Sequence, residues 1–149
     1  MMNTLLQAVA LLLPMKIERV FWDGDTLMLF SAGWSFRTES AWRVSKGGLL
    51  FACWDDDSLD HVSELLGLSI VEVGWLIDAQ PIDPFFKLSD GSVLNAFCSS
   101  STEPWLMEFS DGAVYLGNTY FHKFFLVQKL CSERKNGVRP LFFCVGAKR

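Results

Sequence analysis

The chain has 149 residues, half of them hydrophobic, which fits one domain with a substantial core. Residues 1–122 carry six basic and sixteen acidic side chains, a net charge of −10, whereas residues 123–149 carry seven basic and one acidic, a net charge of +6. Because the acidic body repels phosphate groups, direct nucleic-acid binding is disfavoured. For the basic C-terminal segment we favour packing against the acidic body over phosphate binding.

The first predicted element is a helix over residues 5–13, capped by Asn3-Thr4 and ended by Pro14. It lies in the longest apolar run, 5–15, which falls short of the roughly 20 residues of a membrane span. The run also lacks the basic segment and cleavage site of a signal peptide. We therefore expect a core helix of a cytoplasmic protein that does not bind a membrane.

Alternating hydrophobicity and turn residues predict short strands after this helix. In the first half the strands are expected at 17–22, 26–30, 34–38, 42–44 and 49–54. A second helix over 59–66 is expected to begin at Ser58 and end at Gly67. Strands at 69–76, 84–88, 92–98, 104–109 and 113–117 follow, then a strand or short helix within 119–131 and a last strand at 140–145. Glycine turns favour tight antiparallel hairpins between them, at Asp23-Gly24, Lys46-Gly47-Gly48, Asp90-Gly91 and Asp111-Gly112.

The same order of elements appears twice in the chain. Thr38-Glu39-Ser40-Ala41-Trp42 in the first half has a counterpart, Thr102-Glu103-Pro104-Trp105, in the second. Repetition at this period indicates two copies of one supersecondary unit. We expect a single α+β domain of two helix-plus-antiparallel-meander repeats, residues 3–54 and 58–117, with a C-terminal extension, 118–149. The two units could join edge to edge or stack face to face.

Motifs of known chemistry are missing from the sequence: there is no GxSxG elbow, HExxH helix, CxxC pair or phosphate-binding glycine loop. The two histidines, His61 and His122, are interpreted as surface or packed residues. The four cysteines, at positions 53, 98, 131 and 144, are interpreted as buried free thiols, with two disulfides as the alternative. We therefore predict no catalytic residue, no cofactor and no metal site.

Two carboxylates in matching places, Glu39 and Glu103, each precede a tryptophan that we expect in the core. The glutamates should face solvent or pair with Arg37, Arg43 or Lys87. Paired carboxylates also serve glycosidases, but only at a particular separation. A polar pocket that joined both glutamates to His61 would favour an enzyme.

The densest polar feature is an acidic run after the strand at 49–54. Acidic residues near the start of a helix oppose the positive end of its dipole, but three consecutive aspartates exceed that need. A cation site would require the alternating ligand spacing of a calcium loop, which is lacking. A negative patch for a basic protein partner is the functional alternative. The candidate partner-binding residues are Trp54, Asp55, Asp56, Asp57, Asp60 and Glu64.

Several segments together resemble a family of small bacterial proteins. They are Leu65-Leu66-Gly67, Ile70-Val71-Glu72-Val73, the stretch from Phe86 to Leu94 around Asp90-Gly91, and the stretch from Glu103 to Gly112. This order resembles immunity proteins encoded beside polymorphic or contact-dependent toxins, over residues 12–117 and most strongly over 64–112. The resemblance implies a cytoplasmic protein that binds a toxin domain, such as a basic nuclease, and blocks its active site. It supplies no catalytic positions.

Aromatic content leaves a second hypothesis open. Thirteen Phe and six Trp are many for one core of this size, so they either make a dense core or extend to an apolar surface that meets another molecule. The alternative function is a homodimeric structural or adaptor module without catalytic activity.

Overall fold

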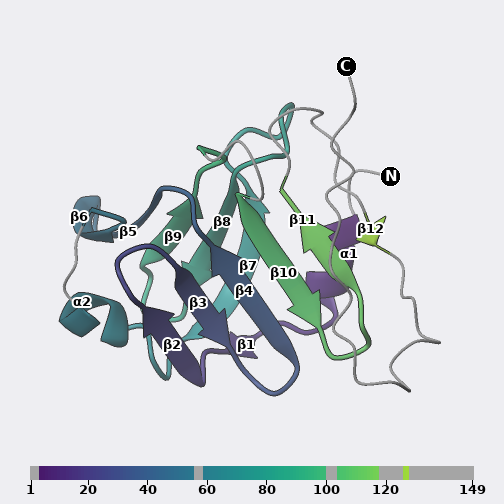
Figure 1. The fold of residues 1–149 in the computed structure, drawn as a ribbon, viewed down its shortest axis with the longest axis horizontal. Helices are drawn as coiled ribbons and strands as arrows, with labels where there is room; N and C mark the ends of the chain where they lie inside the picture. The colour runs from purple at the N-terminus through teal and green to yellow at the C-terminus, as the bar shows by residue number, and fades with distance from the viewer. Residues whose placement is uncertain (1–3, 56–58, 100–103, 118–125, 128–149) are drawn as a thin grey trace.

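The structure, a computed structural model, describes residues 4–55, 59–99, 104–117 and 126–127. It consists mostly of antiparallel strands in two six-stranded sheets, with two short helices (Figure 1). Sheet A contains, in spatial order, β1 (Met15–Lys16), β7 (Ser69–Trp75), β8 (Pro84–Leu88), β9 (Val93–Ala96), β5 (Trp42–Lys46) and β6 (Leu49–Cys53). Sheet B contains β12 (Leu126–Val127), β11 (Val114–Leu116), β10 (Trp105–Phe109), β4 (Trp34–Thr38), β3 (Leu27–Phe30) and β2 (Arg19–Trp22).

Each sheet combines strands from both halves of the chain. Strands β2, β3 and β4 form a meander in sheet B, after which the chain crosses to sheet A for the β5–β6 hairpin. Strands β7, β8 and β9 form a meander in sheet A, after which the chain crosses to sheet B for the β10–β11 hairpin. The halves join where β5 pairs with β9 and β10 pairs with β4. Neither 3–54 nor 58–117 therefore builds a sheet of its own.

Aromatic pairs connect the two sheets across one buried core. Trp22 of β2 meets Trp42 of β5 at 5.0 Å between ring centroids, and Trp75 of β7 meets Trp105 of β10 at 6.1 Å. Between these pairs, Phe36 of β4 contacts Phe86 of β8 at 4.7 Å. The prediction that Trp42 and Trp105 are core residues is confirmed, since at most 1% of either is exposed.

The predicted Asp-Gly turns are confirmed as hairpin connections. In the β2–β3 turn, the Asp23 carboxylate accepts hydrogen bonds from the backbone N–H groups of Asp25 (2.9 Å) and Thr26 (2.8 Å). These bonds hold the pKa of Asp23 below its ordinary value. Gly24 has φ 97°, a left-handed conformation that a residue with a Cβ adopts only with strain.

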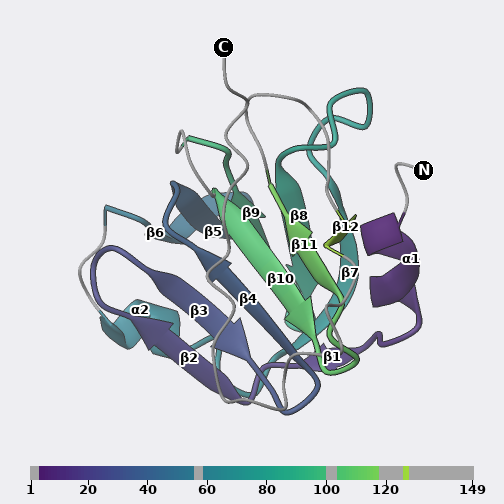
Figure 2. The ribbon, with the colours of Figure 1, turned by 45° about the vertical axis from the view of Figure 1, so that its right-hand side comes forward.

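Both helices are shorter than predicted. Helix α1 (Thr4–Ala10) packs against β7, and α2 (Leu59–Ser63) packs against β2 and β6, at opposite ends of the molecule (Figures 1 and 2). In the described part of the chain, neither helix has the length and apolar character to cross a bilayer. The strand predicted at 140–145 lies outside the described residues, whereas β12 falls within the 119–131 segment.

Candidate functional site

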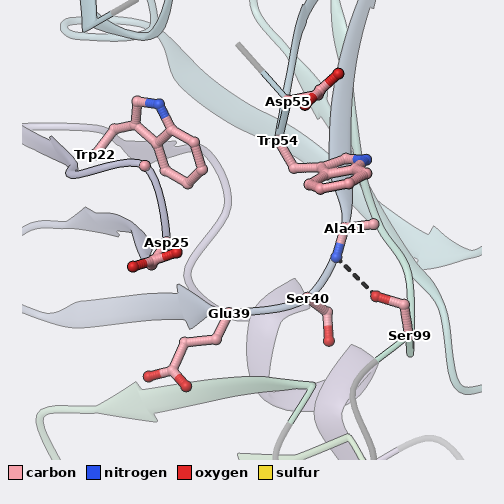
Figure 3. Close-up of a pocket in the computed structure, with 9 residues that line it drawn as sticks. Trp22, Asp25, Glu39, Ser40, Ala41, Trp54, Asp55 and Ser99 are labelled. Atoms are coloured by element: carbon pink, nitrogen blue, oxygen red, sulfur yellow. Dashed lines mark hydrogen bonds between the residues drawn. The ribbon is translucent and has the colours of Figure 1, made fainter. Parts of the chain in front are cut away.

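A surface hollow of about 590 Å³ lies where the ends of both sheets meet, and it is called the Trp22–Trp54 pocket below (Figure 3). Its lining includes two tryptophans and three carboxylates, from Trp22, Asp25, Glu39, Trp54 and Asp55, together with Ser99. Trp22 and Trp54 stand on two walls, and the carboxylates of Asp25 and Glu39 lie together toward one end. The pocket therefore combines aromatic surface with concentrated negative charge.

The sheet register brings Asp25 and Glu39 to the same end of the molecule. Leu27 at the start of β3 pairs with Thr38 at the end of β4, so the residues just beyond each strand end lie near one another. Buried Thr38 fixes the connection that follows: its Oγ1 donates to the Pro104 carbonyl (2.6 Å) and accepts from the Ser40 N–H (3.1 Å). The wall carrying Glu39 is thus tied to the start of β10.

The opposite wall comes from the end of the β5–β6 hairpin. The backbone N–H of Trp54 donates to the Trp42 carbonyl at 3.0 Å, which places Trp54 directly after β6. The side of the pocket near Ala41 is closed by a hydrogen bond from the Ala41 N–H to Ser99 Oγ at 2.8 Å (Figure 3). Trp54 is 54% exposed, whereas Trp22 is 6% exposed and supported by its edge contact with Trp42. Trp54 is therefore the aromatic side chain that the pocket presents to solvent.

The electrostatic balance of the pocket is negative. No lysine or arginine lies among the described residues that line it. Arg37 approaches Glu39 from outside the lining, with Nη2 4.0 Å from Oε1 and both side chains well exposed. An ion pair this long and exposed contributes little, so it leaves the negative charge of Glu39 largely uncompensated. The prediction that Glu39 faces solvent or pairs with Arg37 is confirmed.

A second hollow, of about 540 Å³, lies beside Trp54 and is lined in part by Trp42, Arg43, Leu50 and Phe97. The Arg43 guanidinium lies 5.3 Å from the Phe97 ring centroid and donates to Asn95 Oδ1 at 3.4 Å. Next to it, β6 forms the edge of sheet A and exposes 74% of Leu49 and 64% of Leu50. Trp54 therefore stands between an acidic pocket and an apolar sheet edge.

The predicted acidic site is divided by the structure. Trp54 and Asp55 line the pocket, whereas Asp60 and Glu64 are exposed on and after α2 and do not line it. Asp56 and Asp57 lie outside the described residues. The sequence patterns do not identify Trp22 and Asp25 as pocket residues, because Trp22 ends a predicted strand and Asp25 directly follows the Asp23-Gly24 turn. The pairing of β3 with β4 is the signal that locates Asp25.

Catalytic and metal chemistry gain no geometric support from the described residues. His61 lies on α2 with its ring 5.7 Å from that of Phe51, and it does not line the pocket with Glu39. Glu103 and His122 lie outside the described residues. Where the structure describes the chain, no three His, Cys, Asp or Glu side chains are grouped to hold a metal ion.

The described cysteines, Cys53 and Cys98, are free thiols, as predicted, and both are partly buried. Burial, with the nearby Asp83 carboxylate, raises the pKa of Cys98 to about 12. Its Sγ donates to the Ile82 carbonyl at 2.9 Å. Cys98 is therefore a poor nucleophile and serves the packing of this loop. Cys131 and Cys144 lie outside the described residues.

Comparison with known proteins identifies no relative: no family model, curated protein or solved structure matches the chain. The resemblance to immunity proteins therefore stays a prediction. Any functional conclusion depends on the Trp22–Trp54 pocket and on β6, the strand beside it at the edge of sheet A.

Proposed function

We propose that this chain is a cytoplasmic immunity protein, which binds a cognate bacterial toxin domain and blocks its active site. The supporting observation is the Trp22–Trp54 pocket, where Asp25, Glu39 and Asp55 surround an exposed tryptophan with no basic residue in the described lining. A basic toxin domain, such as a nuclease, offers the complementary charge. Binding at such a surface requires no catalytic group in the inhibitor.

The energetic argument rests on how interfaces distribute binding energy. Tryptophan is enriched among the few residues that dominate affinity, especially when surrounding contacts exclude water. Trp54 has this setting, since exposed Leu50 lies on one side and the carboxylates on the other. The net charge of −10 over residues 1–122 would also accelerate encounter with a basic partner.

The test is calorimetry with the toxin domain encoded by the neighbouring reading frame. Trp54→Ala should weaken binding by about 30-fold, which corresponds to the roughly 2 kcal/mol of a hot-spot residue. The matched control is the double variant Glu72→Gln/Asp78→Asn, which removes two exposed charges outside the pocket and should change affinity less than threefold, or about 0.6 kcal/mol. No binding by the wild-type chain, or no protection of cells that express the toxin, would refute the proposed function.

We further propose that residues 3–54 and 58–117 are two copies of one helix-plus-meander unit. Supporting this, Trp22–Trp42 and Trp75–Trp105 occupy matching strand ends. The backbone bonds Trp54 N–H to Trp42 carbonyl and Gly117 N–H to Trp105 carbonyl are both 3.0 Å long. An experimental structure that lacked these two matched tryptophan pairs would contradict the duplication.

The second candidate function is a homodimeric structural or adaptor module, which the β6 edge favours. Edge strands of monomers are usually protected by charged residues or proline, and Leu49–Cys53 contains neither. A dimer formed by pairing two β6 edges would cover Leu49 and Leu50. Light scattering should then give twice the chain mass, and Leu50→Lys should return it to the monomer; a monomeric wild-type chain would rule this function out.

A further inference from the structure

The second hollow, called the Arg43 hollow below, has a floor built by the β5–β6 hairpin. Side chains alternate along a strand, so Arg43 and Ser45 lie on the face of β5 opposite to the buried Trp42. Their pairing partners on β6 are Cys53 and Leu50, which also line the hollow. The floor therefore belongs to the face of sheet A that points away from the core.

Arg43 is held on this floor from the side of β9. Its Nε–H donates to Oδ1 of Asn95, the buried residue that pairs with it on β9, at 3.4 Å. Its guanidinium carbon lies 5.3 Å from the centroid of the Phe97 ring, which is within the range of a cation–π contact. These contacts occupy Nε and one face of the guanidinium, so both terminal Nη groups can donate to a ligand.

The charge of Arg43 has no acidic counterpart in the hollow. The described lining contains no Asp or Glu, and Arg43 makes no ion pair with a residue that the structure describes. The Trp22–Trp54 pocket has the reverse composition, with three carboxylates and no cation in its described lining. A guanidinium held in this way suits a planar anion, because its two Nη groups can donate parallel hydrogen bonds to both oxygens of a carboxylate.

The rest of the lining favours an apolar group as the carrier of the anion. Exposed Trp54 and Leu50 and the partly buried Phe97 supply aromatic and aliphatic surface. A hollow of about 540 Å³ with this lining and few polar groups has the size of a small-molecule site. The net charge of −10 over residues 1–122 opposes a multiply charged phosphate more strongly than a single carboxylate.

We propose that the Arg43 hollow binds a monocarboxylate whose acid group lies close to a flat apolar ring. The Nη groups of Arg43 donate to the carboxylate, and the ring lies against Trp54 and Leu50. A free aryl carboxylate and a peptide that ends in an aromatic residue share this chemistry. The site goes beyond the proposed immunity function and does not rest on it.

The test is a titration of the full chain with naphthoate, followed by NMR. A ¹⁵N correlation spectrum reports the indole N–H of Trp54 and the Nε–H of Arg43, which are assigned from Trp54→Phe and Arg43→Lys. We expect saturable shifts of both signals. Neutral naphthamide should bind at least about tenfold more weakly because it lacks the charge-assisted hydrogen bonds. Acetate should also bind at least about tenfold more weakly because it buries no ring.

Two variants with the same change of charge locate the carboxylate. Arg43→Gln should weaken naphthoate binding at least about tenfold, whereas Lys87→Gln should leave it within about twofold. Lys87 is the matched control, because it is exposed in the same cross-strand row as Ser45 and does not line the hollow. Preserved chemical-shift dispersion verifies the fold of each variant, and the comparison of naphthoate with naphthamide needs no variant.

The outcomes distinguish the possible ligands. No saturable shift, equal binding of naphthamide, or an unaffected Arg43→Gln variant would overturn the carboxylate site. Equal binding of acetate, or tighter binding of inorganic phosphate than of naphthoate, would overturn the apolar carboxylate as the ligand.

The source of the carboxylate is decided with the peptide acetyl-Gly-Gly-Phe and its C-terminal amide. Tighter binding of the acid than of naphthoate, with loss of binding by the amide, would support the site and assign it to a peptide terminus. Weaker binding of the acid than of naphthoate would support the site and assign it to a small molecule. Failure of the toxin domain to bind would refute the immunity function and leave a positive naphthoate titration intact.

Discussion

The tryptophans Trp42 and Trp105 differ in the hydrogen bonding of their indole N–H groups, which a pair of phenylalanine substitutions can measure. Both begin a strand, both contact a second tryptophan, and at most 1% of either is exposed. Trp105 Nε1–H donates to the Ile82 carbonyl at 2.9 Å, whereas Trp42 Nε1 is buried without a partner among the described residues. Replacement by phenylalanine removes the same atoms at both sites.

The expected magnitude follows from these contacts. The packing loss is similar for the two variants because the volume removed is the same. Trp105→Phe also loses a hydrogen bond worth about 1 kcal/mol, whereas Trp42→Phe removes an unsatisfied buried donor and regains about 1 kcal/mol or more. Trp105→Phe should therefore be less stable than Trp42→Phe by about 2 kcal/mol, or roughly 4–8 °C in Tm for a chain of this size.

The measurement is urea unfolding followed by far-UV circular dichroism, which does not depend on the replaced fluorophores. Equal slopes of the free energy of unfolding against urea would validate the comparison. If Trp42→Phe were as destabilising as Trp105→Phe, Trp42 Nε1 would have an acceptor in the free protein. The assignment of Trp42 Nε1 as an unsatisfied buried donor would then be wrong.

Three further substitutions or measurements test other parts of the structure. Gly117→Ala should lower the free energy of unfolding by about 1–3 kcal/mol, because a Cβ there would lie 2.7 Å from Trp105 Cδ1; a change below about 0.5 kcal/mol in urea unfolding would contradict this packing. Burial of Asp90 acts to raise its pKa, but hydrogen bonds from Ser92 and the ammonium of Lys46 outweigh this effect and lower the pKa below 3.8. The stabilising effect of the ionised Asp90 carboxylate should therefore be present above pH 3.8 and disappear as the pH falls further. Thermal unfolding should therefore show Asp90→Asn less stable than wild type at pH 7 and equal to it near pH 2; a constant difference would contradict the assignment. With the other three cysteines replaced by serine, Cys98 should react with iodoacetamide at pH 8 at least about 100-fold more slowly than N-acetylcysteine, and comparable rates would refute its raised pKa.

Local chemistry was sufficient to predict most strands and turns. The sequence predicts a strand over 84–88, which begins at Pro84 and ends before Asp90-Gly91, and the structure has β8 at Pro84–Leu88. The first helix was expected to reach residue 13 because its apolar spacing continues, yet it ends at Ala10. Pro14 disfavours helical conformation at the residue before it, and Leu11 is 87% exposed. Apolar periodicity alone therefore overestimated this helix.

The exchange of strands between the sheets could not be predicted in the same way. Turn residues specify which strands are adjacent in a hairpin, but the β4–β10 and β5–β9 pairings join segments more than 40 residues apart. Of the described pocket lining, only Ser99, which follows β9, comes from the second half of the chain. Asp25 and Glu39 instead reach Trp54 and Asp55 through the β3–β4 pairing, the connection over residues 39–41 and the β5–β6 hairpin, where the chain passes from sheet B to sheet A. The sequence identifies Trp54 and Asp55 as candidate partner-binding residues and Glu39 as a solvent-facing carboxylate, but it does not indicate that they share a pocket with Trp22 and Asp25.

Two differences between the halves account for the open pocket beside Trp54. Gly117 follows β11 as Trp54 follows β6, and both donate to the carbonyl of the matched tryptophan. Gly117 has no side chain, so the Trp105 indole can lie against it and bond to the longer loop, 76–83. Trp54 instead carries a large side chain and is 54% exposed, and the shorter connection, 23–26, leaves space beside it. Lengthening that connection should therefore close the pocket without altering either sheet, whereas shortening 76–83 should remove the acceptor from Trp105 and open a second pocket around it.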